Sequence, residues 1–118
     1  AVLLNVSAPF HCSLMSKATE VMSNQLKRID FKHSNNVIFS NVTGEEVSDP
    51  RNLKNLLIDQ IEKRVRWRES IVNMIDKGVE HFIEIGPGKV LSGLIKRINK
   101  DVKITSINDQ SDIKSLLI

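Results

Sequence analysis

The sequence predicts an α/β fold with a mainly parallel sheet flanked by helices. Four short strand candidates alternate with longer segments in which apolar residues recur every three or four positions. Such alternation is typical of parallel sheets covered on both faces, with ligands at the carboxyl ends of the strands. The chain has 118 residues, 41% hydrophobic and 4% aromatic, so it can bury one modest and mostly aliphatic core.

Residues 2–7 form the first apolar run, which Ala8-Pro9 ends just before His11, so a strand should lead into a loop that presents this histidine. A helix is expected from Leu14 onward. Its apolar stripe consists of Leu14, Ala18, Val21, Met22, Leu26 and Ile29. Residues 37–42 form the second strand candidate, and Thr43-Gly44 supplies turn chemistry at its end.

The next helix should begin at Asp49-Pro50, because aspartate can cap free amides and proline at the first helical position loses no hydrogen bond. Its apolar positions are Leu53, Leu56, Leu57 and Ile61. A further amphipathic helix over residues 67–77 should end at Gly78, a residue suited to a left-handed terminator. Its expected buried residues are Trp67, Ile71, Met74 and Ile75.

The last part of the chain predicts two strands and two helices. Residues 79–85 form a strand, after which Gly86-Pro87-Gly88 turns the chain into another helix. The apolar residues of that helix are Val90, Leu91, Leu94, Ile95 and Ile98. Residues 102–107 return as a strand, and residues 111–118 predict a final helix. No linker or repeat divides the chain, so we expect one domain or part of one.

Composition narrows the class of protein. A net charge of +3 is too small to demand a nucleic acid partner, and no apolar run is long enough to cross a bilayer. Cys12 is the single cysteine, so no intrachain disulfide is possible and a cytoplasmic setting is expected. We expect no cofactor and no metal. The chain opens at Ala1 already in an apolar run, which hints that a preceding element is missing.

His11 is the candidate catalytic residue. An imidazole can take a proton from a hydroxyl or thiol and return it near neutral pH, provided that its other ring nitrogen is held by an acceptor. Its position after a strand and before a helix is typical of an active-site residue. On chemistry alone, the alternative that His11 merely caps or packs is favoured, because no partner is visible in the sequence.

Four ordered blocks of sequence carry a family resemblance. They are Val6-Ser7-Ala8-Pro9-Phe10-His11-Cys12-Ser13-Leu14-Met15, Ser40-Asn41-Val42-Thr43, Val65-Arg66-Trp67-Arg68-Glu69-Ser70 and Glu84-Ile85-Gly86-Pro87-Gly88-Lys89-Val90-Leu91. Their order and spacing resemble the C-terminal part of malonyl-CoA:acyl carrier protein transacylases, over about Leu4 to Ile98. The resemblance implies that residues 1–118 are the C-terminal part of a single acyltransferase domain with an α/β-hydrolase-like core, whose N-terminal half is missing.

In that family, a serine attacks the malonyl thioester and the phosphopantetheine thiol of acyl carrier protein then collects the malonyl group, a step of fatty acid biosynthesis. The resemblance implies that His11 is the base and acid of this reaction. It also implies that the backbone carbonyl of Gln60 orients the imidazole. The partners would be malonyl-CoA and acyl carrier protein, with no nucleic acid or membrane involved. Phe10 before His11 agrees with selection of malonyl groups.

Two parts of the family's site have no counterpart in this sequence. No serine lies in a Gly-x-Ser-x-Gly elbow, and the arginine that pairs with the malonyl carboxylate lies upstream in the family. We do not assign that role to Arg66 or Arg68. The isolated chain is therefore predicted to be inactive, and an upstream fragment that carries the serine is a possible partner. The alternatives are a noncatalytic remnant, a carrier-protein-binding fragment, or a piece of a polyketide synthase acyltransferase.

Three further features favour structural interpretations. Gly86-Pro87-Gly88-Lys89 matches neither common phosphate-binding loop, so a tight strand-to-helix turn is more consistent with it. The basic cluster, which consists of Lys63, Arg64, Arg66 and Arg68, could steer an acidic partner, but a solvated surface is favoured. Cys12 is interpreted as a packing residue or a bystander rather than a nucleophile.

Overall fold

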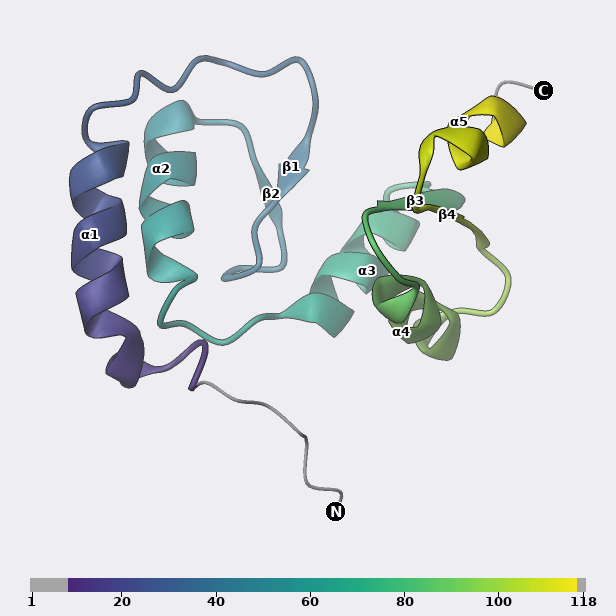
Figure 1. Ribbon diagram of the computed structural model, residues 1–118, viewed down its shortest axis with the longest axis horizontal. Helices are drawn as coiled ribbons and strands as arrows, with labels where there is room; N and C mark the ends of the chain where they lie inside the picture. Colours follow the sequence, from purple (N-terminus) through teal and green to yellow (C-terminus); the bar gives the residue numbers. More distant parts are fainter. Residues whose placement is uncertain (1–8, 117–118) are drawn as a thin grey trace. The chain divides into compact units, whose positions relative to one another are not determined.

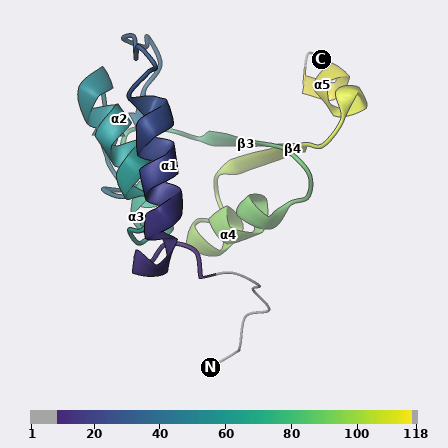
Figure 2. The same cartoon turned by 60° about the vertical axis from the view of Figure 1, so that its left-hand side comes forward.

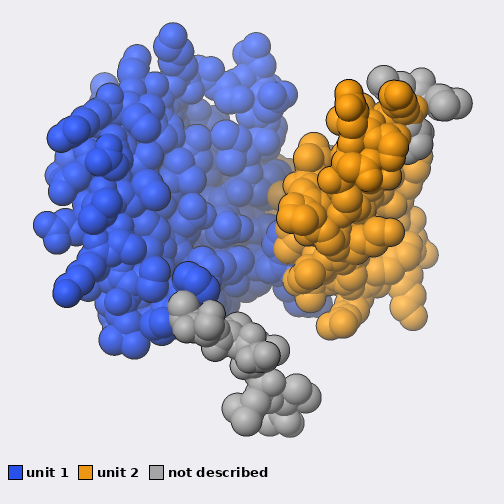
Figure 3. Space-filling model, viewed as in Figure 1, with its two compact units in different colours: residues 1–70 blue, residues 71–118 orange. Residues whose placement is uncertain are grey.

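The computed structural model describes residues 9–116 and divides the chain into two compact units, residues 1–70 and residues 71–118 (Figures 1 and 3). The first predicted strand, over residues 2–7, lies outside the described residues. The interpretation of residues 1–118 as part of a single domain stays a prediction.

The first unit contains a helix pair and a short hairpin. Its elements are η1 (Ser13–Met15), α1 (Ser16–Leu26), β1 (Ile38–Phe39), β2 (Glu46–Val47) and α2 (Pro50–Asp59). The helices α1 and α2 pack side by side (Figure 1). The beginning of α2 is as predicted, because the Asp49 carboxylate accepts the amides of Arg51 at 3.3 Å and Asn52 at 3.0 Å.

The second predicted strand is shorter than expected. Residues 37–42 were expected to be extended, but β1 covers only Ile38–Phe39 and pairs antiparallel with β2, a strand that the sequence pattern did not reveal. The reason is the turn that follows β1. The amide of Gly44 donates to the Ser40 carbonyl at 2.8 Å, and the amide of Ser40 donates to the Glu45 carbonyl at 2.9 Å. These bonds curl residues 40–45 into a loop instead of a strand.

Gly44 is required in this loop. Its φ of +75° lies in the left-handed region, which a residue with a Cβ adopts only with strain. A Cβ at this position would lie 3.0 Å from the Cβ of Glu69 and 3.5 Å from that of Arg66. The buried loop at Gly44 therefore packs closely against the beginning of α3 (Trp67–Asp76), whose first turn belongs to this unit.

The predicted apolar stripe of the first helix is not the face that α1 turns toward α2. Leu14 is 75% exposed and Val21 is 62% exposed, and only Leu26 among the stripe residues is half-buried. The half-buried residues of this segment are instead Met15, Thr19, Ser23 and Leu26. Periodicity located a helix correctly, but it could not tell which neighbouring element the apolar face meets.

The second unit is a parallel strand pair with flanking helices (Figure 2). Its elements after α3 are β3 (His81–Ile85), α4 (Val90–Ile98), β4 (Lys103–Ile107) and α5 (Gln110–Leu116). The strands β3 and β4 pair in parallel, with Ile83 opposite Thr105. The buried apolar residues of this unit are Ile71, Phe82, Ile95, Val102 and Ile107. All four elements lie within a few residues of the predicted bounds, and Gly78 follows α3 with φ +90°.

Glu84 connects β3 to the beginning of α4. Its carboxylate accepts the amides of Leu91 at 3.0 Å and Ser92 at 2.8 Å, together with the Ser92 hydroxyl at 2.5 Å. The first amides of a helix have no partner inside the helix, so a carboxylate from the preceding strand satisfies them. The hydrogen bonds from the Ser92 side chain and backbone lower the pKa of Glu84 below its usual value. The predicted Gly86-Pro87-Gly88 turn is thereby held at both ends.

Among residues 9–116, no helix is both long enough and apolar enough to span a membrane.

Candidate active site

His11 lies in a tight turn just before η1. Its φ of +59° is uncommon for any residue other than glycine, and such backbone strain is found preferentially at functional sites. The Cys12 thiol donates to the Pro9 carbonyl at 3.1 Å, and the amide of Met15 donates to the Cys12 carbonyl at 3.0 Å. These two bonds close the turn on either side of the imidazole. Cys12 thus stabilises the turn, in keeping with a noncatalytic role.

Gln60 lies at the end of α2. Its amide still donates to Leu56 at 3.0 Å, but the three amides after Gln60 turn back to the carbonyls of residues 58 and 59. Carbonyls at the end of a helix lack partners inside the helix and need an outside donor. The sequence therefore leaves the Gln60 carbonyl available for a side chain from elsewhere in the unit.

His11 supplies that donor. Its Nδ1 atom lies 2.7 Å from the carbonyl oxygen of Gln60. A carbonyl oxygen can only accept, so the proton of this bond must be carried by Nδ1. In the neutral ring, Nε2 is then left with a free lone pair, which is the arrangement that a general base needs. The turn before η1 and the end of α2, far apart in the sequence, are joined by this bond.

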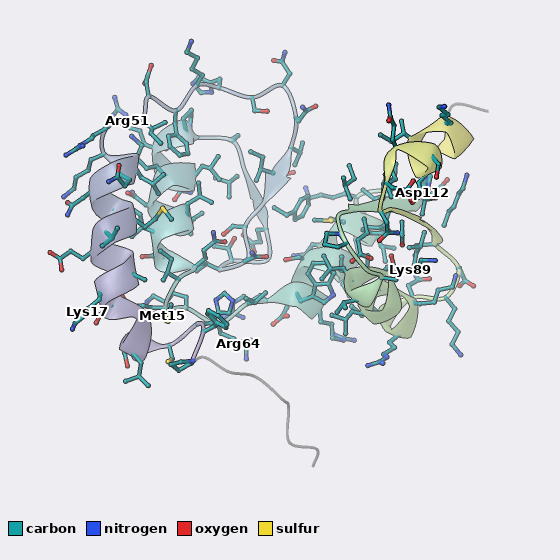
Figure 4. All side chains as sticks on the ribbon, viewed as in Figure 1. Met15, Lys17, Arg51, Arg64, Lys89 and Asp112 are labelled. Carbon is teal, nitrogen blue, oxygen red and sulfur yellow. The ribbon has the colours of Figure 1, made fainter. Side chains whose placement is uncertain are left out.

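The imidazole lines an open hollow in the first unit. The residues around it are Phe10, His11, Met15, Asn41, Gln60 and Ile61. His11 itself is exposed, so a substrate can approach the ring. Figure 4 shows Met15 just before α1 and Arg64 in the segment after α2, at the same end of the helix pair. This geometry suits a histidine that exchanges a proton with an incoming group.

Asn41 is a residue of this hollow to which sequence reasoning gave no role. Its Nδ2 donates to the side-chain oxygen of Gln60 at 3.2 Å, and its own carbonyl accepts the amide of Arg66 at 2.8 Å. The only signal in the sequence was its place in the block Ser40-Asn41-Val42-Thr43. Three of the four blocks therefore contribute residues to one region of the first unit.

The basic cluster is partly neutralised. Glu69 forms ion pairs with Arg64 at 3.1 Å and Arg66 at 3.5 Å. A hydrogen bond from the backbone of Glu69, together with the nearby arginine charges, lowers the pKa of its carboxyl. Both pairs are exposed, so their contribution to stability is small. This arrangement supports the interpretation of the cluster as a solvated surface.

The fourth block, around Gly86-Pro87-Gly88, lies in the second unit. The amide of Gly88 donates to the Asn108 side chain at 2.7 Å, and Glu84 caps α4. These contacts make the segment a fixed strand-to-helix turn. Among the described residues, no group of three His, Cys, Asp or Glu side chains could hold a metal ion.

No protein-family model matches the chain. Curated proteins do match it. The malonyl CoA-acyl carrier protein transacylase of Staphylococcus aureus strain COL is 43% identical over 111 residues, which cover 94% of this chain and 36% of that protein. The chain thus spans about a third of the length of the curated relatives it matches.

Solved structures give the same result. A crystal structure of an acyl-carrier-protein-S-malonyltransferase from Bartonella henselae has a TM-score of 0.89 and 42% identity, over 98% of this chain and 37% of that one. A malonyl-transacylase in complex with its type II polyketide synthase acyl-carrier protein has a TM-score of 0.87 and 32% identity, over 97% of this chain and 37% of that one. These matches confirm the resemblance and the mixed α/β acyltransferase architecture that the sequence predicted.

Proposed function

Because the chain is homologous to the C-terminal part of malonyl-CoA:acyl carrier protein transacylases, we propose that it supplies the histidine base of malonyl transfer. The reaction moves a malonyl group from malonyl-CoA to the phosphopantetheine thiol of acyl carrier protein. The serine nucleophile comes from a region that matches the rest of the relatives' length. On this proposal, residues 1–118 contribute His11 and Gln60 to an active site that is completed by that region.

The proposed role of His11 follows from the free lone pair on Nε2. As the serine oxygen attacks the malonyl thioester, its O–H bond breaks and Nε2 takes the proton. The bond between the carbonyl carbon and the sulfur then breaks, and the coenzyme A sulfur leaves with that proton. In the second half, the carrier thiol gives its proton to Nε2 and attacks the malonyl ester. The serine oxygen recovers a proton as the malonyl group departs.

The observation that carries the proposal is the bond of 2.7 Å between His11 Nδ1 and the Gln60 carbonyl. It keeps Nδ1 protonated in both halves of the reaction, so Nε2 is the ring nitrogen that takes up and returns the proton. When the ring takes up a proton, its positive charge also lies at the C-terminal end of α2, where the helix dipole favours a cation. A carbonyl in place of an acidic side chain is therefore a sufficient partner for the base.

Exposed apolar surface on both units supports the proposal that this chain needs a further polypeptide to cover it. In the first unit, Leu14 and Val21 are mostly exposed. In the second unit, Ile83 is 47% exposed and Ile85 is 79% exposed on β3, although parallel strands are normally covered on both faces. An upstream polypeptide that carries the serine would cover such surface as it completes the site. It is the partner that we propose besides malonyl-CoA and acyl carrier protein.

The acyl carrier protein that accepts the malonyl group could belong to fatty acid synthesis or to polyketide synthesis. One matched structure is, by its description, a malonyl-transacylase with a type II polyketide synthase carrier, so a polyketide carrier is the second candidate partner. The Staphylococcus aureus relative is named only for an acyl carrier protein, and a carrier of fatty acid synthesis is the first candidate partner. Both carriers present a phosphopantetheine thiol to the same base. Parallel assays with one carrier of each type separate the two candidates.

The experiment uses radiolabelled malonyl-CoA and holo acyl carrier protein. The purified chain is assayed alone and then after mixing with the serine-bearing upstream region of the Staphylococcus aureus relative. Label should reach the carrier only in the mixture, because the chain has no nucleophile elbow to hold the malonyl group. Label on the carrier from the isolated chain would contradict the split site. Binding of the two polypeptides without any transfer would favour the noncatalytic alternative.

A further inference from the structure

A chain of three residues leads from the loop after β1 to the imidazole. Asn41 Nδ2 donates to the side-chain oxygen of Gln60 at 3.2 Å, and the backbone carbonyl of the same glutamine accepts from His11 at 2.7 Å. The side chain of Gln60 is therefore held on one side and its carbonyl on the other. Within residues 9–116, these two hydrogen bonds join the side-chain oxygen and the backbone carbonyl of Gln60 to two other residues of the hollow.

We propose that Asn41 is a positioning residue for His11, acting through Gln60. Holding the Gln60 side chain fixes the orientation of the peptide whose carbonyl keeps Nδ1 protonated. As a statement about catalysis, this inference rests on the proposed function. As a statement about the tautomer of His11, it stands independently of acyl transfer.

Gln60 needs such an anchor because of its place in the fold. It follows the last residue of α2, and the amides after it fold back into a tight turn. Helix ends fray, and a rotation of the peptide after Gln60 would turn its carbonyl away from the ring. The position of Gln60 on the helix alone therefore does not secure the bond to His11.

Asn41 is a suitable anchor because its own backbone is held. Its carbonyl accepts the amide of Arg66 at 2.8 Å, and the next residue, Val42, donates to the Ser40 hydroxyl at 3.1 Å. The Gly44 amide closes the same loop onto the Ser40 carbonyl at 2.8 Å. The Asn41 side chain therefore projects from a fixed loop, whereas the residue that it holds lies at a helix end.

The test is a double-mutant cycle read by NMR. The ring nitrogens of His11 are followed in the ¹⁵N-labelled chain for wild type, Asn41→Leu, Gln60→Leu and the double variant. His11→Gln assigns the signals, and circular dichroism verifies that each variant is folded. Wild type should show a protonated Nδ1 and an unprotonated Nε2. Asn41→Leu should populate both tautomers, so that the two nitrogen shifts move toward each other.

The cycle separates positioning from general stability. Gln60→Leu keeps the carbonyl but loses the anchored side chain, so it should shift the tautomer as Asn41→Leu does, and the double variant should add nothing. Asn41→Asp should restore the wild-type spectrum, because its carboxylate can accept from the Gln60 amide once that amide turns over. Asn36→Leu, a change at another exposed loop asparagine of the same unit, should leave the His11 signals unchanged.

Asn41→Ser, which is too short to reach Gln60, replaces Asn41→Leu in the cycle if the larger side chain unfolds the protein. Wild-type His11 shifts in a folded Asn41→Leu or Asn41→Ser variant would overturn the inference. So would strictly additive effects in the cycle.

In the mixture with the serine-bearing region, Asn41→Leu should lower kcat about fivefold with KM unchanged, which is the effect of one ordinary hydrogen bond. If Asn41→Leu shifts the His11 tautomer but the wild-type mixture transfers no malonyl group, the proposed function is refuted and the positioning role of Asn41 is left intact.

Discussion

The Nδ1 atom of His11 and the carbonyl oxygen of Gln60 lie 2.7 Å apart, although 49 positions separate the two residues in the sequence. This relationship gives an exposed histidine a definite tautomer without help from an acidic side chain. It joins a strained turn to the end of a helix, and both partners are groups that local structure alone leaves unsatisfied.

Gly44→Ala should destabilise the first unit. A residue with a Cβ pays about 1–2 kcal/mol in the left-handed region, and the added methyl group would lie 3.0 Å from the Cβ of Glu69. Chemical denaturation should therefore show a lower free energy of unfolding than wild type. Gly93→Ala is the control, because Gly93 lies inside α4 with open space at its Cβ position. That change should stabilise the chain by about 0.5–1 kcal/mol. Equal stability of the two variants would show that the loop at Gly44 is not constrained as described.

Glu84→Gln should reduce stability at neutral pH but not in acid. Hydrogen bonds from Ser92 lower the pKa of Glu84 in the folded chain. The contribution of Glu84 to the free energy of unfolding is therefore fully present above the ordinary glutamate pKa of about 4.3. It is lost as the pH falls through the lower pKa that Glu84 has in the folded chain. Melting curves of wild type and variant should differ at pH 7 and converge as the medium becomes more acidic.

Glu80→Gln is the matched control, since Glu80 is exposed in the same unit and its backbone carbonyl, which the substitution leaves in place, accepts the amide of Lys103 at 2.8 Å. It should melt like wild type throughout the pH range. A constant difference between wild type and Glu84→Gln at all pH values would mean that the carboxylate charge does not cap α4.

The isolated chain should self-associate through the outer face of β3. Ile83 and Ile85 are 47% and 79% exposed there, and uncovered apolar faces of parallel strands promote association. Replacing both by threonine preserves β-branching and removes apolar surface. Sedimentation velocity should show larger species for wild type and a shift toward monomer for the double variant. Val37→Thr, at a similarly exposed position of the first unit, should not change the distribution. A wild-type chain that is monomeric at every concentration would contradict this prediction.

The sequence predicted most helices and strands because local chemistry marks them strongly. Asp49-Pro50 begins α2 with capping geometry, and Gly78 follows the end of α3 with a positive φ. The alternation of elements also correctly predicted the parallel pairing of β3 and β4. In each case the deciding interaction lies within a few residues of the feature, or follows from the period of the apolar pattern.

The remaining features depended on contacts that no local pattern records. The loop at Gly44 shortened the strand expected over residues 37–42, and the partner strand β2 was missed. Most of the apolar stripe expected for the first helix is exposed, which the periodicity could not predict because it does not identify a neighbouring element. The bond between His11 and Gln60 was expected only through family resemblance, since a backbone carbonyl leaves no signature in the sequence. Asn41 was missed for a similar reason.

The assembled enzyme tests the central claim, that His11 is the base of malonyl transfer. In the mixture of this chain with the serine-bearing region, kcat/KM for malonyl transfer is compared among wild type, His11→Ala and His33→Ala. His33 is an exposed histidine of the same unit outside the hollow. Loss of the base should lower the rate by about 10²–10⁴-fold, whereas His33→Ala should react like wild type. Wild-type turnover by the His11→Ala chain, with assembly of the two polypeptides verified, would contradict the account.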